Sequence, residues 1–142
     1  MQPDAAQPRE LLTGETHLAH QAMRALRTTY ESDERFVEYV DGVLRPAGYR
    51  LLGAFSPDRE SAVAVAGFRV GDNLAWGHYL YVDDLSTAPE ARRQGLAGAL
   101  LEWLIEEGSP RRSRSWIYAP GQCRPRAPAA PALVRAPRDG WR

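Results

Sequence analysis

A run of small residues ahead of an amphipathic segment is the feature of this sequence most suited to chemistry. Gly95, Ala97 and Gly98 lie where the chain passes from a loop into a predicted helix. The first turn of a helix leaves backbone N–H groups without intrahelical partners, and the helix dipole adds about half a positive charge there. Small side chains let a diphosphate approach those amides, and Arg92 and Arg93 can neutralise its charge. Packing and solubility explain the same residues equally well, so spacing alone leaves both interpretations open.

Other reactive residue types are sparse, and their scarcity excludes several classes of chemistry. All 18 cationic residues are Arg, so the chain lacks the Lys of a Walker loop or of a Schiff base. His17, His20 and His78 stand at no metal-ligand spacing with a further His or with Cys123, and we expect no metal. A single cysteine cannot form an internal disulfide, and the sequence has neither a charged-then-apolar leader nor an apolar stretch of membrane-spanning length. We therefore expect a cytoplasmic protein.

The spacing of apolar residues follows two periods, and these predict the helices and strands that position the small residues. Apolar residues three and four apart predict helices, and apolar runs rich in Val and Tyr predict strands. In chain order we expect a short strand at 9–12, helices at 13–30 and 33–45, strands at 49–55, 62–70 and 75–85, and a last helix that Gly108 caps. Thr13 is the expected N-cap of the first helix, and Ser32 or Asp33 opens the second. Three strands joined by short turns predict an antiparallel meander, with the two early helices on one face.

The composition of the chain changes near Gly108. Residues 1–108 carry 10 Arg against 17 Asp and Glu, whereas residues 109–142 carry 8 Arg, 6 of the 11 Pro and Asp139 as their single acid. The second segment follows neither a helical nor a strand period. We therefore predict one domain over residues 1–108 and an irregular Arg/Pro/Ala-rich tail over residues 109–142, in which residues 113–119 are a candidate strand.

The motif at the small-residue segment resembles that of a known family. Arg92-Arg93-Gln94-Gly95-Leu96-Ala97 is similar to the Arg/Gln-x-x-Gly-x-Gly/Ala signature of the GNAT superfamily of N-acetyltransferases, and residues 80–89 resemble the strand that precedes it. The order of elements over residues 9–108 also agrees with that superfamily. The resemblance implies an α/β, GNAT-like (acyl-CoA N-acyltransferase) fold, with a mostly antiparallel central sheet flanked by helices. This chain departs from the family after residue 108, where we expect the C-terminal strand and helix to be missing or irregular.

The resemblance implies acetyl-coenzyme A as the co-substrate. Its pyrophosphate would lie on the amides from Arg93 to Gly98, and its pantetheine arm would pair with the backbone of Leu85 and Thr87. The cofactor-binding residues implied in this way are Leu85, Thr87, Arg92, Arg93, Gln94, Gly95, Leu96, Ala97 and Gly98.

Two carboxylates, Asp83 and Asp84, end the strand before this loop. Adjacent strand residues point to opposite faces, so we expect only one of them to reach an acceptor amine. By resemblance to family members with an acidic pair, Asp83 is the favoured catalytic residue that holds or deprotonates the amine, and Asp84 is the second candidate. The backbone N–H of Leu85 would then donate to the thioester oxygen, and Tyr118 is the remaining candidate acid. The alternative is that both carboxylates only bind Arg or cap a loop.

The function implied is transfer of an acetyl group from acetyl-coenzyme A to a primary amine of a small molecule or peptide, by direct attack in a ternary complex. Because the chain departs from the family after residue 108, a non-catalytic or degenerate coenzyme A-binding remnant is the alternative. A third hypothesis, nucleic-acid binding by the tail, rests on Arg111, Arg112, Arg114, Arg124 and Arg126. Few aromatic residues stand among these arginines, so we do not favour nucleic acid. We expect no membrane partner, and a homodimer is left open.

Overall fold

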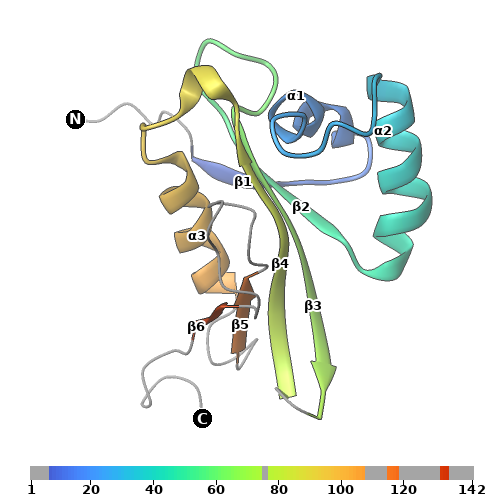
Figure 1. Ribbon diagram of the computed structural model, residues 1–142, viewed down its shortest axis with the longest axis vertical. Helices are drawn as coiled ribbons and strands as arrows, with labels where there is room; N and C mark the ends of the chain where they lie inside the picture. The colour runs from blue at the N-terminus through green and yellow to red at the C-terminus, as the bar shows by residue number, and fades with distance from the viewer. Residues whose placement is uncertain (1–6, 75–76, 108–114, 119–131, 135–142) are drawn as a thin grey trace.

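A mixed sheet with helices on both faces forms the body of the protein. The computed structural model describes residues 7–74, 77–107, 115–118 and 132–134. These residues form a six-stranded sheet in the order β1-β2-β3-β4-β5-β6 (Figure 1). The strands are β1 (Pro8–Leu11), β2 (Arg50–Ala54), β3 (Ala64–Asn73), β4 (Gly77–Thr87), β5 (Ser115–Tyr118) and β6 (Ala132–Val134). Neighbouring strands run antiparallel, except β4 and β5, which are parallel. The predicted α/β class with a mostly antiparallel sheet is confirmed.

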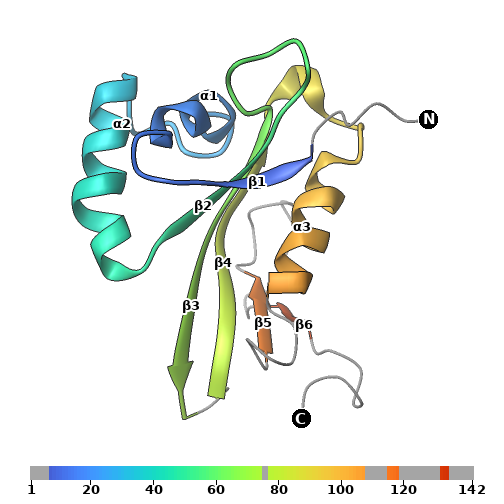
Figure 2. The same ribbon diagram turned by 180° about the vertical axis from the view of Figure 1, so that it is seen from behind.

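The helices divide between the two faces of the sheet. In chain order the helical segments are η1 (Thr16–Ala19), α1 (His20–Met23), α2 (Asp33–Tyr39), η2 (Val40–Leu44), η3 (Arg45–Ala47), η4 (Pro89–Ala91) and α3 (Leu96–Glu107). Figures 1 and 2 show α1 and α2 against one face of the sheet and α3 against the other. The early helices therefore share a face, as the sequence predicts.

The second of the predicted helices is confirmed, whereas the first is much shorter than expected. Ser32 caps α2, because its side-chain oxygen accepts a hydrogen bond from the N–H of Arg35 at 3.3 Å. The helix predicted over 13–30 is wrong in both bounds, and Thr13 is not its N-cap. Gly14 adopts a left-handed φ of 98°, which turns the chain directly after Thr13 and delays the helix to Thr16. After Met23 the chain leaves the helix, and Ala25, Leu26 and Arg27 contribute to the lining of two pockets.

Two apolar clusters fill the space on either side of the sheet. The cluster against α3 includes Phe68, Leu80, Val82, Leu100 and Leu104, all of them buried. The cluster against α1 and α2 includes Leu11, Met23, Phe36, Leu51 and Val65. Successive strand residues alternate between these clusters, as the period of a strand requires. The three strands of the predicted meander are present, with ends that differ from the expected ones by a few residues.

A β-bulge interrupts this alternation in the middle of the sheet. Gly67 of β3 is opposite Asp84 of β4, and Phe68 is opposite Val82, so Asp83 is the extra residue in β4. Beyond the bulge the side chains of β4 change face: Val82 packs in the α3 cluster, whereas Asp84 contacts Tyr49 in the other cluster. The bulge thus determines where both acidic side chains point.

The segment that the sequence predicts to be irregular contributes two short strands to the sheet. β5 lies within the candidate strand at 113–119 and pairs with Tyr79 to Val82 of β4. β6 in turn pairs with β5. Gly108 and Cys123 lie outside the described residues, as does the segment between β5 and β6. Within the part of the chain that is described, no helix is long and apolar enough to cross a membrane.

Candidate active site

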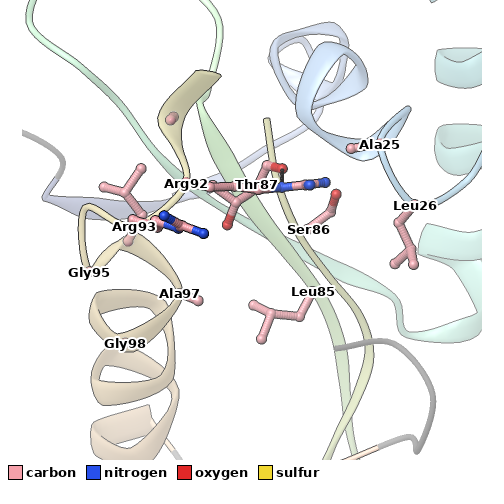
Figure 3. Close-up of a pocket in the computed structure, with 12 residues that line it drawn as sticks. Ala25, Leu26, Leu85, Ser86, Thr87, Arg92, Arg93, Gly95, Ala97 and Gly98 are labelled. Carbon is pink, nitrogen blue, oxygen red and sulfur yellow. Dashed lines mark hydrogen bonds between the residues drawn. The ribbon is translucent and has the colours of Figure 1, made fainter. Parts of the chain in front are cut away.

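A pocket of about 560 Å³ lies between the start of α3, the end of β4 and the segment that follows α1 (Figure 3). Its lining residues are Ala25, Leu26, Leu85, Ser86, Thr87, Ala91, Arg92, Arg93, Gly95, Leu96, Ala97 and Gly98. Figure 3 shows Leu85 of β4 and Ala97 of α3 pointing toward each other across it. All of the residues expected to bind coenzyme A line this pocket except Gln94, which is exposed. The tertiary structure thus brings the strand end and the small-residue segment to one cavity.

The loop that enters α3 has a backbone suited to an anion. Arg93 and Gly95 have φ angles of 67° and 76°, in the left-handed region. Backbone turns of this kind can direct successive N–H groups to one side and form an anion-binding concavity. The left-handed conformation costs a non-glycine residue such as Arg93 about 1 kcal/mol or more. α3 then begins at Leu96 and runs for 12 residues, so its dipole adds positive potential at the same point.

The space at the Cβ positions of Gly95 and Gly98, in this pocket, is not filled by other protein atoms. A Cβ built on Gly95 or on Gly98 would meet no atom within 4 Å. Packing within the chain therefore does not require glycine at Gly98, whose backbone is ordinary helix. The open space fits a group that approaches the backbone closely, as the pyrophosphate of coenzyme A would.

A second pocket, of about 220 Å³, lies on the α1 and α2 side of the sheet. It is lined by Met23, Arg27, Thr29, Tyr30, Phe36, Tyr39, Val40, Leu44, Tyr49 and Asp84. Of these, only Asp84 is a site residue expected from the sequence. The spacing of Phe36, Val40 and Leu44 on one helical face was the available signal, and it indicated only a core-facing stripe.

Asp84 is the carboxylate at this second pocket, and two side chains hold it. It is 9% exposed. One of its oxygens accepts from Nε of Arg27 at 2.8 Å, and the other accepts from the hydroxyl of Tyr49 at 2.7 Å. Burial of the phenol, together with the adjacent Asp84 carboxylate, raises the pKa of Tyr49 well above its usual value. Tyr49 therefore stays protonated and acts as a fixed donor to Asp84.

Asp83 points to the same side of the sheet as Asp84 but has a different partner. It forms two hydrogen bonds of 2.8 Å with the guanidinium of Arg69, which also lies over the ring of Tyr81. The expectation that the two carboxylates point to opposite faces is wrong, because the bulge at Asp83 interrupts the alternation. Asp83 lines neither of the two pockets described here.

The two pockets meet at consecutive residues. Leu26 and Leu85 line the larger pocket, and their chain neighbours Arg27 and Asp84 line the smaller one. A ligand in each would therefore be separated by little more than the backbone of β4 and of the segment after α1. This arrangement can bring two substrates together for direct group transfer.

His20 serves a structural role. His20 is buried and stacked on Phe36, with Nδ1 at 2.6 Å from a carboxylate oxygen of Asp33 and Nε2 at 3.1 Å from the carbonyl oxygen of Tyr30. These contacts fix the loop between α1 and α2, which forms part of the smaller pocket. Nowhere in the described ranges do three or more His, Cys, Asp or Glu side chains gather as they would around a metal ion.

Comparison with known proteins identifies the family of this chain. The Acetyltransferase (GNAT) family model matches residues 16–127. Since the match spans well over half of the sequence, the chain belongs to the GNAT acetyltransferase family, whose members are acyltransferases. This confirms the resemblance drawn from Arg92 to Ala97. Among curated proteins, none matches the sequence significantly.

Three solved structures with the same fold are distant from this chain in sequence. An acetyltransferase from Trypanosoma brucei has a TM-score of 0.67 and 16% identity, over 80% of this chain and 81% of that one. A predicted acetyltransferase with acetyl-CoA from Clostridium acetobutylicum has a TM-score of 0.59 and 18% identity, over 80% and 79% of the two chains. An aminoglycoside acetyltransferase from an uncultured soil metagenomic sample has a TM-score of 0.62 and 20% identity, over 82% and 80%. At these identities the likeness concerns the fold alone.

Proposed function

We propose that this protein transfers an acetyl group from acetyl-coenzyme A to a primary amine of a small molecule or peptide, by direct attack in a ternary complex. The observation that carries the proposal is the larger pocket, where the start of α3, Arg92 and Arg93 lie beside the end of β4. The membership of the GNAT acetyltransferase family and the solved relative with acetyl-CoA support the choice of donor.

The residues of the larger pocket fit the parts of this donor. Backbone N–H groups from Arg93 to Gly98 would bind the pyrophosphate, and the two arginines would balance its charge. Leu85 and Thr87 sit on β4 where the extended pantetheine arm could pair with the strand, and the N–H of Leu85 would donate to the thioester oxygen. Acetyl-coenzyme A supplies an acetyl carbonyl that an uncharged amine can attack, with a thiolate as the leaving group.

Asp84 is the residue that we assign to the acceptor amine. Its carboxylate lines the smaller pocket next to Leu85, so an amine held there would lie close to the donor. As a hydrogen-bond acceptor Asp84 can orient the nitrogen and take up its proton, directly or through water. This order reverses the one drawn from the sequence, because Asp84 lines the smaller pocket whereas Asp83 lines neither pocket and is paired with Arg69.

Donor binding and turnover test the proposal together. Acetyl-coenzyme A at about 100 times its Kd should add about 2.7 kcal/mol to the free energy of unfolding, measured as a rise in Tm. Thiol release should then follow only when an amine is added, with one acetylated amine formed for each thiol. Stabilisation without any acetylated product would instead support the non-catalytic coenzyme A-binding alternative. If the donor neither stabilises the protein nor yields an acetylated product, both functions are contradicted.

Substitution of Gly98 by Ala separates ligand binding from packing. The added methyl group meets no protein atom, and alanine should stabilise α3 by up to about 1 kcal/mol. The same methyl group lies where we place the pyrophosphate, so Gly98→Ala should weaken coenzyme A binding at least tenfold in calorimetry. Gly42→Ala is the matched control, since Gly42 is helical, exposed and equally open around its Cβ position but lies outside the pocket. Unchanged coenzyme A affinity in Gly98→Ala would argue against this binding mode.

A further inference from the structure

We infer that the smaller pocket accepts one primary amine carried on a single compact apolar group, such as a 2-phenylethyl group, and disfavours polyamines and aminoglycosides. The inference rests on the proposed function, and it narrows the acceptor class that the family leaves open. It depends on the walls, the charges, the volume and the position of this pocket.

Aromatic and aliphatic side chains form the walls. The rings of Tyr30 and Tyr39 are stacked with centroids 5.5 Å apart, and Phe36 meets Tyr30 edge-on at 6.3 Å. Met23, Val40 and Leu44 complete the apolar lining on the side of α1 and α2. Tyr39 is 40% exposed, so part of this wall remains available to a ligand. An apolar group would exchange water for these side chains, which favours its binding.

The charges at the pocket leave a place for one ammonium group. Asp84 and Arg27 are the charged side chains among the described lining residues. A carboxylate has about four lone-pair sites, and Arg27 and Tyr49 occupy one on each oxygen of Asp84. A single amine can therefore still donate to Asp84. A polyamine or an aminoglycoside would bring several further cations next to Arg27 and to apolar walls, which lack counter-charges for them.

The volume of the pocket limits the apolar group. An apolar cavity of about 150 Å³ holds a benzene molecule. The 220 Å³ here can therefore hold a phenyl ring with a short linker, whereas most of an aminoglycoside would lie outside the pocket, away from its apolar walls. With the ring against Tyr30 and Phe36, a two-carbon linker could place the nitrogen at Asp84, beside the donor pocket.

The test compares amines at saturating acetyl-coenzyme A. We expect kcat/KM for 2-phenylethylamine to exceed that for ethylamine at least tenfold, and to exceed those for spermidine and tobramycin. Tyr39→Ala should lower the ratio of 2-phenylethylamine to ethylamine several-fold, because it removes a wall of the pocket. Val43→Ala is the control: Val43 is 51% exposed on the neighbouring helical turn and does not line the pocket, so the ratio should not change.

A ratio near one, or a preference for spermidine or tobramycin, would overturn the inference. If no amine is acetylated, the proposed function fails. Calorimetry of amine binding without acetyl-coenzyme A then tests the inference separately. Binding of 2-phenylethylamine that Tyr39→Ala weakens and Val43→Ala does not would support it. Absence of binding, or binding that Tyr39→Ala leaves unchanged, would overturn it.

Discussion

Gly67→Ala is expected to lower the free energy of unfolding by about 2–4 kcal/mol and to abolish most acetyl transfer. A Cβ on Gly67 would overlap the hydroxyl end of Tyr49, whose ring is buried and cannot move into solvent. The overlap forces Tyr49 away from Asp84, so a buried hydrogen bond is lost along with good packing. Because Gly67 is opposite Asp84 in the sheet, the same shift disturbs the carboxylate assigned to the amine.

Gly71→Ala provides the control for this effect. Its Cβ would also meet a tyrosine ring, that of Tyr79, at distances as short as 2.6 Å. Tyr79 is only half-buried and lies near the turn of the β3–β4 hairpin, so displacing its ring should cost less than displacing the buried ring of Tyr49. Chemical denaturation should therefore give a loss below about 1 kcal/mol for Gly71→Ala. A loss for Gly67→Ala that is also below about 1 kcal/mol would show that Tyr49 is not as constrained as its burial indicates.

Asp84→Asn is expected to lower kcat/KM by about 10²-fold or more, whereas Asp83→Asn should lower it less than tenfold. Asparagine keeps the shape of Asp84 and can still accept from Tyr49, but it takes up no proton and holds an ammonium group poorly. Asp83 points toward Arg69 rather than into either pocket, so its loss should affect the local ion pair more than the chemistry.

Steady-state kinetics with acetyl-coenzyme A and a reactive amine would compare the two variants. Donor affinity should remain unchanged in both, since neither carboxylate lines the larger pocket. A larger loss for Asp83→Asn than for Asp84→Asn would restore the assignment drawn from the sequence.

The larger pocket was the part of the candidate site most open to prediction. Its main components, from Arg92 to Gly98, are contiguous in the chain, and small residues at a helix start carry their physical meaning locally. The same holds for Ser32, whose side chain caps a helix three residues away. The first helix was predicted too long, because its apolar spacing continued past Met23 while a glycine turn and tertiary contacts decided its ends.

The smaller pocket could not be predicted in this way. Arg27, Tyr49 and Asp84 are far apart in the chain, and only the folded sheet brings them into contact. The bulge at Asp83 is likewise a property of two paired strands, and it reversed the expected orientation of one carboxylate relative to the other.

The sequence by itself determined the family, the alternation of helices and strands, and the small-residue start of α3, because periodicity and helix-terminus chemistry depend on near neighbours. Only the tertiary structure decided which carboxylate faces the second pocket and what surrounds it, because strand register and long-range packing are set by the whole folded chain.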